Sequence, residues 1–153
     1  NEKYKHEIEG YNERIDSLQA AILQVKLKYL EEWNNKRIKN TELYYTYLNK
    51  NKIILPYVPD RAKHVYHQFV IRIKNRDEFI NYLKNEGIST AVNYPIPLHL
   101  QPAYTQLGFK KGDFPITELV SEEIVSLPIY PEMTEEQIMY VIEKVNKFTE
   151  TLK

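Results

Sequence analysis

Apolar residues at helical spacing dominate the N-terminal third of the chain, after an irregular lead-in over residues 1–14. Asp16 and Gln19 occupy the positions of a capping box, and the pattern behind them predicts one long helix over about 16–49. That helix would measure roughly 50 Å at about 1.5 Å per residue. Its two adjacent apolar stripes cover more than one surface, so we expect part of it to rest on something outside its own domain. The stripe residues are Leu18, Ile22, Val25 and Tyr29, and Leu23, Leu27 and Leu30.

Period-two alternation of apolar and polar residues runs through His64–Ile73 and predicts a half-buried strand there. Shorter strands are expected at 52–56 and 88–92. A further strand is expected at 126–130, where a proline limits it to a sheet edge.

The remaining pattern predicts a helix from Asp77 to Gly87, a short helix within 100–107 and a helix over 116–125. A final amphipathic helix follows the capping box Thr134–Gln137. This order of elements predicts an α+β fold, with a small mixed, mainly antiparallel sheet covered by helices on one face. The long N-terminal helix would lie partly outside that sandwich.

Composition narrows the class of protein. A length of 153 residues suits one domain, and a net charge of zero provides no global field for nucleic acid or an anionic membrane. No run of about 18 apolar residues is present to span a bilayer, and the polar N-terminus does not resemble a signal peptide. The absence of cysteine fits a reducing compartment, so we expect a cytoplasmic protein with no nucleic-acid or membrane partner. The missing initiator Met suggests a processed chain or a fragment.

A proline-stiffened loop follows the strand expected at 88–92. Prolines in a loop exclude regular hydrogen bonding and lower the entropic cost of ordering it. The polar side chains concentrated in this loop are Tyr94, His99, Gln101 and Tyr104. Such a loop is either a binding site held still by its scaffold or a surface turn whose tips pack on the domain. The residues alone leave both interpretations open.

No complete catalytic apparatus is recognisable in the residues. The four histidines lack the i, i+4 spacing of a helical metal site, so we expect no metal. His67 lies on the apolar face of its expected strand, where a hydrogen-bonded core histidine is commoner than a ligand. The four scattered glycines form no phosphate loop, and no serine nucleophile motif is present. Asn12 precedes the long helix, whose free N–H groups would favour an anion, although an ordinary turn asparagine is the alternative.

Several short motifs stand in collinear order along the chain. The N-terminal ones are Tyr4-x-His6, Gly10-Tyr11-Asn12-x-Arg14, Leu18-Gln19-Ala20-Ala21 and Leu27-x-x-Leu30. The later ones are Asn93-Tyr94-Pro-Ile-Pro-Leu-His99-Leu-Gln-Pro-Ala-Tyr104, Gly112-Asp-x-Pro115-x-x-Glu118, Ser126-Leu-Pro-Ile-Tyr-Pro131 and Thr134-x-x-Gln137. Together they resemble the DegT-like nucleotide-sugar aminotransferases, which depend on pyridoxal 5'-phosphate (PLP). The resemblance covers essentially the whole chain.

The resemblance implies that residues 1–153 are the C-terminal (small) domain of an aspartate-aminotransferase-like fold, with the interdomain and dimer helix at about 16–49. In that family a large N-terminal domain, absent here, carries the lysine that binds PLP and acts as general base. No residue of this chain inherits that role. The resemblance therefore predicts no catalytic residue here and no transamination by this chain alone, within an enzyme that is a homodimer.

Candidate binding residues also follow from the resemblance. The family asparagine that reaches across the dimer to the PLP phosphate of the neighbouring subunit falls on Asn12. The segment near the nucleotide diphosphate falls on Tyr4 and His6, and the loop that lines the sugar end of the site places Tyr94 and His99 there. This loop is more similar to that of enzymes acting on 3-keto sugars than on 4-keto sugars.

The function that the resemblance implies is conversion of a keto-sugar nucleotide to an amino sugar, with PLP as cofactor and glutamate as donor. The rival hypothesis is a binding or scaffold module that keeps the small domain and dimer helix without chemistry. The upstream sequence separates the two hypotheses, because a lysine in a Gly-rich context there supports the enzyme.

Overall fold

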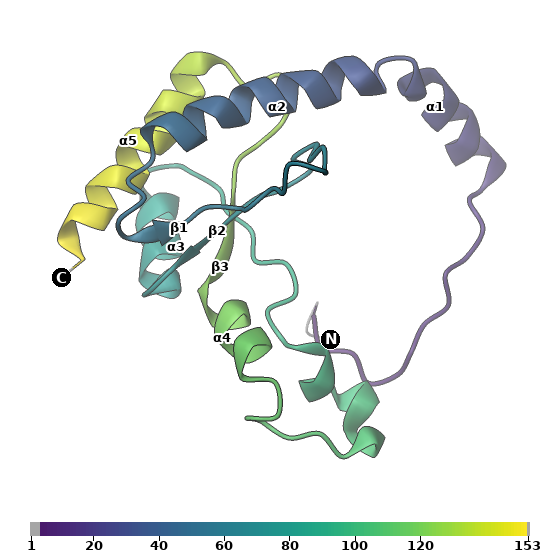
Figure 1. Cartoon of the computed structure of the whole chain (residues 1–153). Helices are drawn as coiled ribbons and strands as arrows, with labels where there is room; N and C mark the ends of the chain where they lie inside the picture. Colours follow the sequence, from purple (N-terminus) through teal and green to yellow (C-terminus); the bar gives the residue numbers. More distant parts are fainter. Residues whose placement is uncertain (1–3, 153) are drawn as a thin grey trace.

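The computed structural model of the chain describes residues 4–152 (Figure 1). Its elements are α1 (Ser17–Leu27), α2 (Leu30–Tyr47), β1 (Ile53–Ile54), β2 (Phe69–Ile73), α3 (Arg76–Asn85), η1 (Leu98–Leu100), η2 (Pro102–Leu107), α4 (Pro115–Glu123), β3 (Ile124–Leu127) and α5 (Glu135–Thr151). Residues 4–30 are termed the N-terminal arm, and residues 31–152 are termed the body. Within the described part of the chain, no helix is both long enough and apolar enough to cross a membrane.

Three antiparallel strands form the sheet, with β2 between β1 and β3. The register places Phe69 opposite Leu127 and Ile53 opposite Ile73. A single antiparallel bridge from Ala91 to Ser126 continues the sheet beyond β3. The predicted α+β class and the mainly antiparallel sheet are confirmed.

One face of the sheet carries the core. Alternate residues of β2 point to that face, and Phe69, Ile71 and Ile73 are buried there. The ring of Tyr44 on α2 stacks on Phe69 with 4.8 Å between ring centroids. α2, α3 and α5 cover this face in Figure 1. The opposite face carries the half-buried residues Val70 and Arg72 of the same strand.

The final helix forms as the sequence predicted. Thr134 and Gln137 make the reciprocal hydrogen bonds of a capping box at its N-terminus. Its apolar stripe is buried against the core and consists of Ile138, Val141, Ile142, Val145 and Phe148.

The prediction of a single long helix over about 16–49 is wrong, because the helix is interrupted between α1 and α2. The N–H of Tyr29 donates to the carbonyl of Lys26 at 3.0 Å, three residues back instead of four. Tyr29 itself has φ −104° and ψ −3°, away from the φ of about −63° and ψ of about −42° of a regular α-helix. The tight turn redirects α1 away from the axis of α2, as Figure 1 shows at the right of the view.

The strand predicted over His64–Ile73 is also too long, since β2 covers only its second half. Tyr66 adopts φ 49°, in the left-handed region, and its N–H donates to Nδ1 of His64 at 2.9 Å. This local turn replaces the ladder and reverses the alternation, so that Tyr66 is buried while Val65 and His67 are exposed. The expectation that His67 is a core histidine is therefore wrong.

Smaller differences occur at other element boundaries. The helix expected from Asp77 begins at Arg76, with Asn75 in the left-handed region at its N-cap. The strand expected at 88–92 is reduced to the bridge at Ala91. The short helix expected within 100–107 is replaced by two 3-10 turns, η1 and η2, because Pro97 and Pro102 prevent a continuous α-helix.

Candidate functional site

Residues 4–6 of the arm lie against the proline loop of the body. The side-chain amide of Gln101 accepts from the N–H of His6 at 3.0 Å and donates to the carbonyl of Tyr4 at 2.9 Å. The N–H of Ala103 donates to the carbonyl of His6 at 2.9 Å. Figure 1 shows the N-terminal end of the described chain beside η1 and η2. The fold thus brings Tyr4 and His6 to the loop that carries Tyr94.

His99 points from this loop into the body. Its Nε2 lies 2.9 Å from Oε1 of Glu118 on α4, and the two side chains are 8% and 11% exposed. Its ring also contacts the ring of Phe114, with 4.7 Å between centroids. His99 therefore links the proline loop to α4.

Glu118 is held as a carboxylate by the turn that precedes α4. The N–H of Gly112 donates to both carboxylate oxygens, at 2.8 and 3.0 Å, and Gly112 has φ 101°, which favours glycine. This hydrogen bond, followed by that to His99, lowers the pKa of Glu118. The spacing of Gly112-Asp-x-Pro115-x-x-Glu118 thus has a local cause, because Pro115 starts α4 and Glu118 lies in its first turn.

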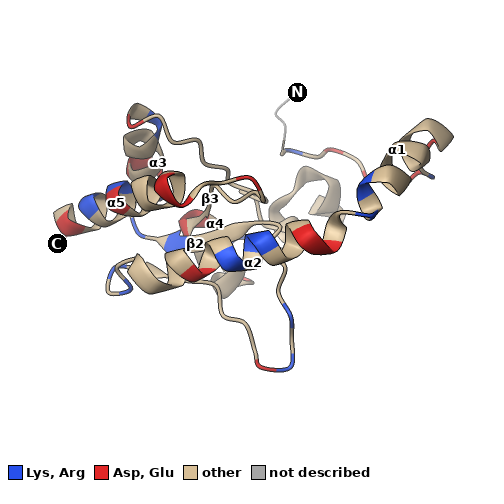
Figure 2. Cartoon of the chain, turned by 90° about the horizontal axis from the view of Figure 1, so that it is seen from above, with Lys and Arg blue, Asp and Glu red and all other residues tan. Residues whose placement is uncertain are grey.

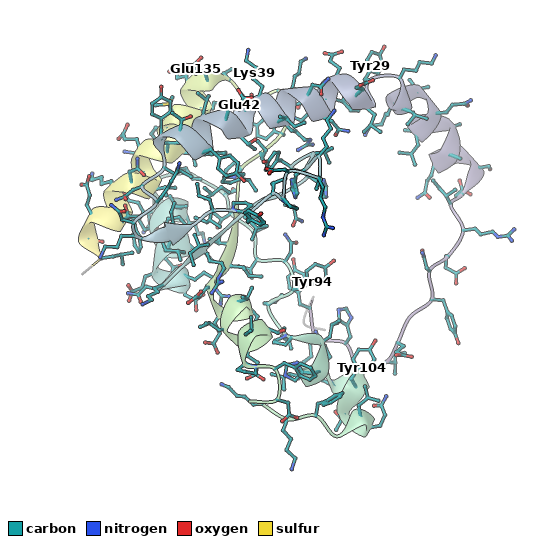
Figure 3. The ribbon with its side chains drawn as sticks, in the orientation of Figure 1. Tyr29, Lys39, Glu42, Tyr94, Tyr104 and Glu135 are labelled. Carbon is teal, nitrogen blue, oxygen red and sulfur yellow. The ribbon has the colours of Figure 1, made fainter. Side chains whose placement is uncertain are left out.

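Tyr94 has different surroundings from His99. It is 79% exposed and has φ 59°. It lies at a hollow of about 110 Å³ on the sheet face opposite the core, and in Figure 3 it lies towards the space between the sheet and the arm. The hollow is lined by Gln68, Val70, Ala91, Asn93, Tyr94, Ile124, Val125 and Ser126. Tyr94 is therefore accessible to a ligand, whereas Nε2 of His99 is already hydrogen-bonded.

Asn12 lies in the extended part of the arm. It and Arg14 are exposed, and neither side chain bonds to another described residue. The carboxylate of Asp16 accepts from the N–H of Leu18 at 2.8 Å and caps α1. The N-terminus of α1 therefore gives no support to anion binding at Asn12, because Asp16 separates Asn12 from the helix and already caps it.

The arm nevertheless fits the phosphate end of PLP. The exposed amide of Asn12 and guanidinium of Arg14 are hydrogen-bond donors of the kind that bind phosphate oxygens.

Lys144 does not fit the role of the lysine that binds PLP covalently. Its ammonium lies 3.2 Å from the carboxylates of both Glu86 and Glu143, and hydrogen bonds to them raise its pKa, whereas a nucleophilic lysine requires a lowered one.

Metal ligation has no comparable support in the part of the chain that the structure describes. No group of three or more His, Cys, Asp or Glu residues is placed there to hold a metal ion. The candidate chemistry of these residues is hydrogen bonding to a polar, phosphate-bearing ligand.

An apolar surface on the arm extends from α1 to the start of α2. None of the eleven residues of α1, all of which the structure describes, is buried. A hollow of about 530 Å³ on this surface is lined by Ile15, Ala20, Leu23, Gln24, Lys26, Leu27, Leu30 and Trp33. Figure 2 shows few charged residues on α1, whereas α2 carries blocks of Glu and of Lys and Arg along its length. The sequence predicted that this part of the chain carries apolar surface that its own domain does not cover, and that surface is present.

Sequence reasoning assigned no role to two residues that build this site. Gln101 was recognised only as one polar side chain of the loop, and Glu118 only as part of a motif. Their partners lie 95 and 19 residues away for the bonds to His6 and His99. No periodic pattern reports such pairings, although the fixed spacing from Gly112 to Glu118 was a usable signal.

Comparison with known proteins connects this geometry to one family. The sequence matches the DegT/DnrJ/EryC1/StrS aminotransferase family over residues 1–146. It is 44% identical over 149 residues to a pleiotropic regulatory protein of Geobacillus stearothermophilus. It is 42% identical over 146 residues to dTDP-3-amino-3,6-dideoxy-alpha-D-galactopyranose transaminase of Aneurinibacillus thermoaerophilus. Each alignment covers 95% of this chain and 40% of the relative, so the chain spans about two fifths of their length.

Solved structures agree with this assignment. DesV of S. venezuelae is 35% identical with a TM-score of 0.86, over 99% of this chain and 41% of DesV. NtdA of Bacillus subtilis, solved with the bound cofactor PMP, is 32% identical with a TM-score of 0.79, over 93% of this chain and 34% of NtdA. The aminotransferase-like fold that the sequence predicted is confirmed.

Proposed function

This chain belongs to the DegT/DnrJ/EryC1/StrS aminotransferase family, and we propose from that premise that it is the C-terminal part of a PLP-dependent enzyme that converts a keto-sugar nucleotide to an amino sugar. The observation that carries the proposal is the family match over residues 1–146, together with 42% identity to a sugar-nucleotide transaminase. The name of that relative places the amino group at carbon 3, which supports a 3-keto substrate. We propose glutamate as the amino donor.

The proposed parent protein has two parts. Residues 1–153 form its small domain with α1 and α2 preceding the sheet, and a large domain outside this chain supplies the lysine that binds PLP. When bound, PLP provides the electron sink that lets an amino group move between donor and substrate. The PMP found in NtdA supports this cofactor. The chain alone would then be inactive.

The cofactor end of the site is assigned to the arm. Asn12 donates to the PLP phosphate of the neighbouring subunit, which its exposed amide makes feasible. The parent is accordingly a homodimer, in which the apolar surface of α1 contacts protein beyond this chain. A sedimentation measurement showing a monomeric parent would contradict this assignment.

The substrate end is assigned to the proline loop and to the residues held beside it. Tyr94 offers an exposed hydroxyl to the sugar, while Tyr4 and His6 lie where the diphosphate would bind. His99 closes the same end of the site. Its Nε2 already bonds to Glu118, so this nitrogen is not offered to the ligand.

The proposal is tested with the parent protein, PLP, glutamate and a panel of 3-keto and 4-keto sugar nucleotides. We expect a product whose mass shows that an amino group has replaced the carbonyl oxygen. The isolated chain, incubated with PLP and reduced with borohydride, should carry no stoichiometric lysine adduct. Such an adduct would contradict the placement of the lysine outside the chain.

A second candidate function is a regulatory or scaffold module without chemistry. The 44% identity to a protein named as a pleiotropic regulator favours it. This function predicts that the parent forms no product with any member of the panel and retains no PLP. Retained PLP together with an aminated product would exclude it.

A further inference from the structure

The side-chain amide of Gln101 acts as a peptide group in a short ladder between the arm and the proline loop. Its oxygen accepts from the N–H of His6 and its nitrogen donates to the carbonyl of Tyr4, at 3.0 and 2.9 Å. The N–H of Ala103 continues the ladder to the carbonyl of His6 at 2.9 Å. Gln101 is 6% exposed, so water competes poorly for these bonds.

This ladder fixes the arm shortly before Asn12. The hydroxyl of Tyr104 adds a hydrogen bond to Glu9, which raises the pKa of Tyr104. The following residues, 10–16, are exposed, and they carry Asn12 towards α1. The position of Asn12 relative to the body therefore depends on contacts made by residues 101–104.

His99, two residues before Gln101, connects the same loop to α4. It binds Glu118 on α4, while Gln101 binds the arm. Two side chains of one stiff loop thus join three segments: residues 4–6, the loop itself and α4.

We propose that Gln101 is a positioning residue that couples the cofactor end of the site at Asn12 to the substrate end at Tyr94. The roles of Asn12 and Tyr94 rest on the proposed function, whereas the joint between arm and loop rests on the hydrogen bonds alone. A change at Gln101 should therefore weaken cofactor and substrate binding together, although its hydrogen bonds go to neither Asn12 nor Tyr94.

Three variants of the parent protein isolate this role. Gln101→Met keeps the length of the side chain and removes both the donor and the acceptor. Gln101→Glu keeps an acceptor for the N–H of His6 but places a carboxylate oxygen against the carbonyl of Tyr4. Gln106→Met makes the same change at an exposed glutamine of η2 and serves as the matched control.

The first measurement is amide hydrogen exchange at His6 and Ala103. Loss of a net contribution typical of one hydrogen bond should speed exchange at His6 about tenfold in Gln101→Met. Gln101→Glu should retain most of the protection at His6, and Gln106→Met should match the wild type. Unchanged exchange at His6 in Gln101→Met would overturn the proposal.

The second measurement is the Kd for PLP together with the KM for the sugar nucleotide. Both should rise in Gln101→Met, each by up to about tenfold if one hydrogen bond orients each end, with kcat affected less. Faster exchange with unchanged Kd and KM would show a purely structural contact and would also overturn the proposal. If Gln101→Met does not fold, Gln101→Glu must raise both constants for the proposal to stand. A parent that lacks aminotransferase activity would contradict the proposed function. Amide hydrogen exchange and PLP affinity would still test whether Gln101 joins the arm to the loop.

Discussion

α1 in the arm and α5 in the body make a direct comparison, because both begin at a capping residue and carry apolar residues at helical spacing. Asp16 caps α1 and Thr134 caps α5. Six residues of α5 are buried against the core, whereas no residue of α1, which the structure describes in full, is buried. Equivalent local signals therefore lead to a packed helix in one case and an open one in the other.

The difference lies in how the apolar residues are distributed around the helix. Those of α5 fall on one stripe that is buried in the core, while those of α1 fall on two stripes. An isolated helix of this length is marginal in water, and a helix that is apolar around most of its surface is normally buried. We therefore expect α1 to contact protein outside this chain, as the proposed large domain and second subunit would provide.

The largest effect should come from one substitution made in both regions. Leu83→Ala on α3 empties a fully buried position and should lower the free energy of unfolding of the chain by about 2–5 kcal/mol. Leu23→Ala on α1, where the side chain is 50% exposed, should change it by no more than about 0.5 kcal/mol. Urea denaturation of both variants measures the contrast. Equal losses would show that α1 is packed as tightly as the body.

Asn12→Ala in the parent protein tests whether the arm contributes a contact to PLP. Loss of a hydrogen bond to a charged group, about 1.5–3 kcal/mol, should raise the Kd for PLP about 10-fold to 100-fold. Stability of the body should not change, because Asn12 is exposed. Asn35→Ala, at an exposed position of α2, is the matched control. Unaltered PLP affinity in Asn12→Ala would refute the assignment.

Glu118 provides a pH test within the body. Its pKa in the folded chain is lowered from 4.5, first by the N–H of Gly112 and then by His99. The ionised carboxylate therefore stabilises the fold above that ordinary value, and this stabilisation is lost as pH falls through the lower folded pKa.

Glu118→Gln should accordingly be less stable at neutral pH and should lose less further stability between pH 5 and about 3 than the wild type. Glu122→Gln, at an exposed position of the same helix, should keep the wild-type dependence. Unfolding free energies measured across this range decide the matter, and parallel curves for Glu118→Gln and wild type would contradict it.

The smallest effect is expected from the two helix caps. Thr134→Ala removes a capping box from α5 and should lower the free energy of unfolding by about 1 kcal/mol. Asp16→Ala removes the equivalent cap of α1 and should reduce helical circular dichroism without moving the unfolding midpoint. A shift of the midpoint in Asp16→Ala would show that α1 unfolds together with the body.

The sequence alone determined those elements for which the helix cap and the spacing of apolar residues indicate the same structure. The capping box and apolar stripe of α5 predicted its start and its buried face, because periodicity directly reports which side of a helix avoids water. The α+β class followed from the order of elements. The family motifs also identified Asn12, Tyr4, His6, Tyr94 and His99 as candidate ligand residues, whose roles stay predictions.

Tertiary structure alone decided the features that depend on partners far apart in the sequence. Beside the local turn at Tyr66 that ended the expected strand, the ring of Tyr66 packs near that of Tyr45, 21 residues earlier, with 6.1 Å between centroids. The joint at Gln101 and the inward bond of His99 to Glu118 likewise required segments that no periodic pattern connects. Each of these bonds requires two distant segments of the chain to lie side by side, and that arrangement is fixed only when the chain has folded.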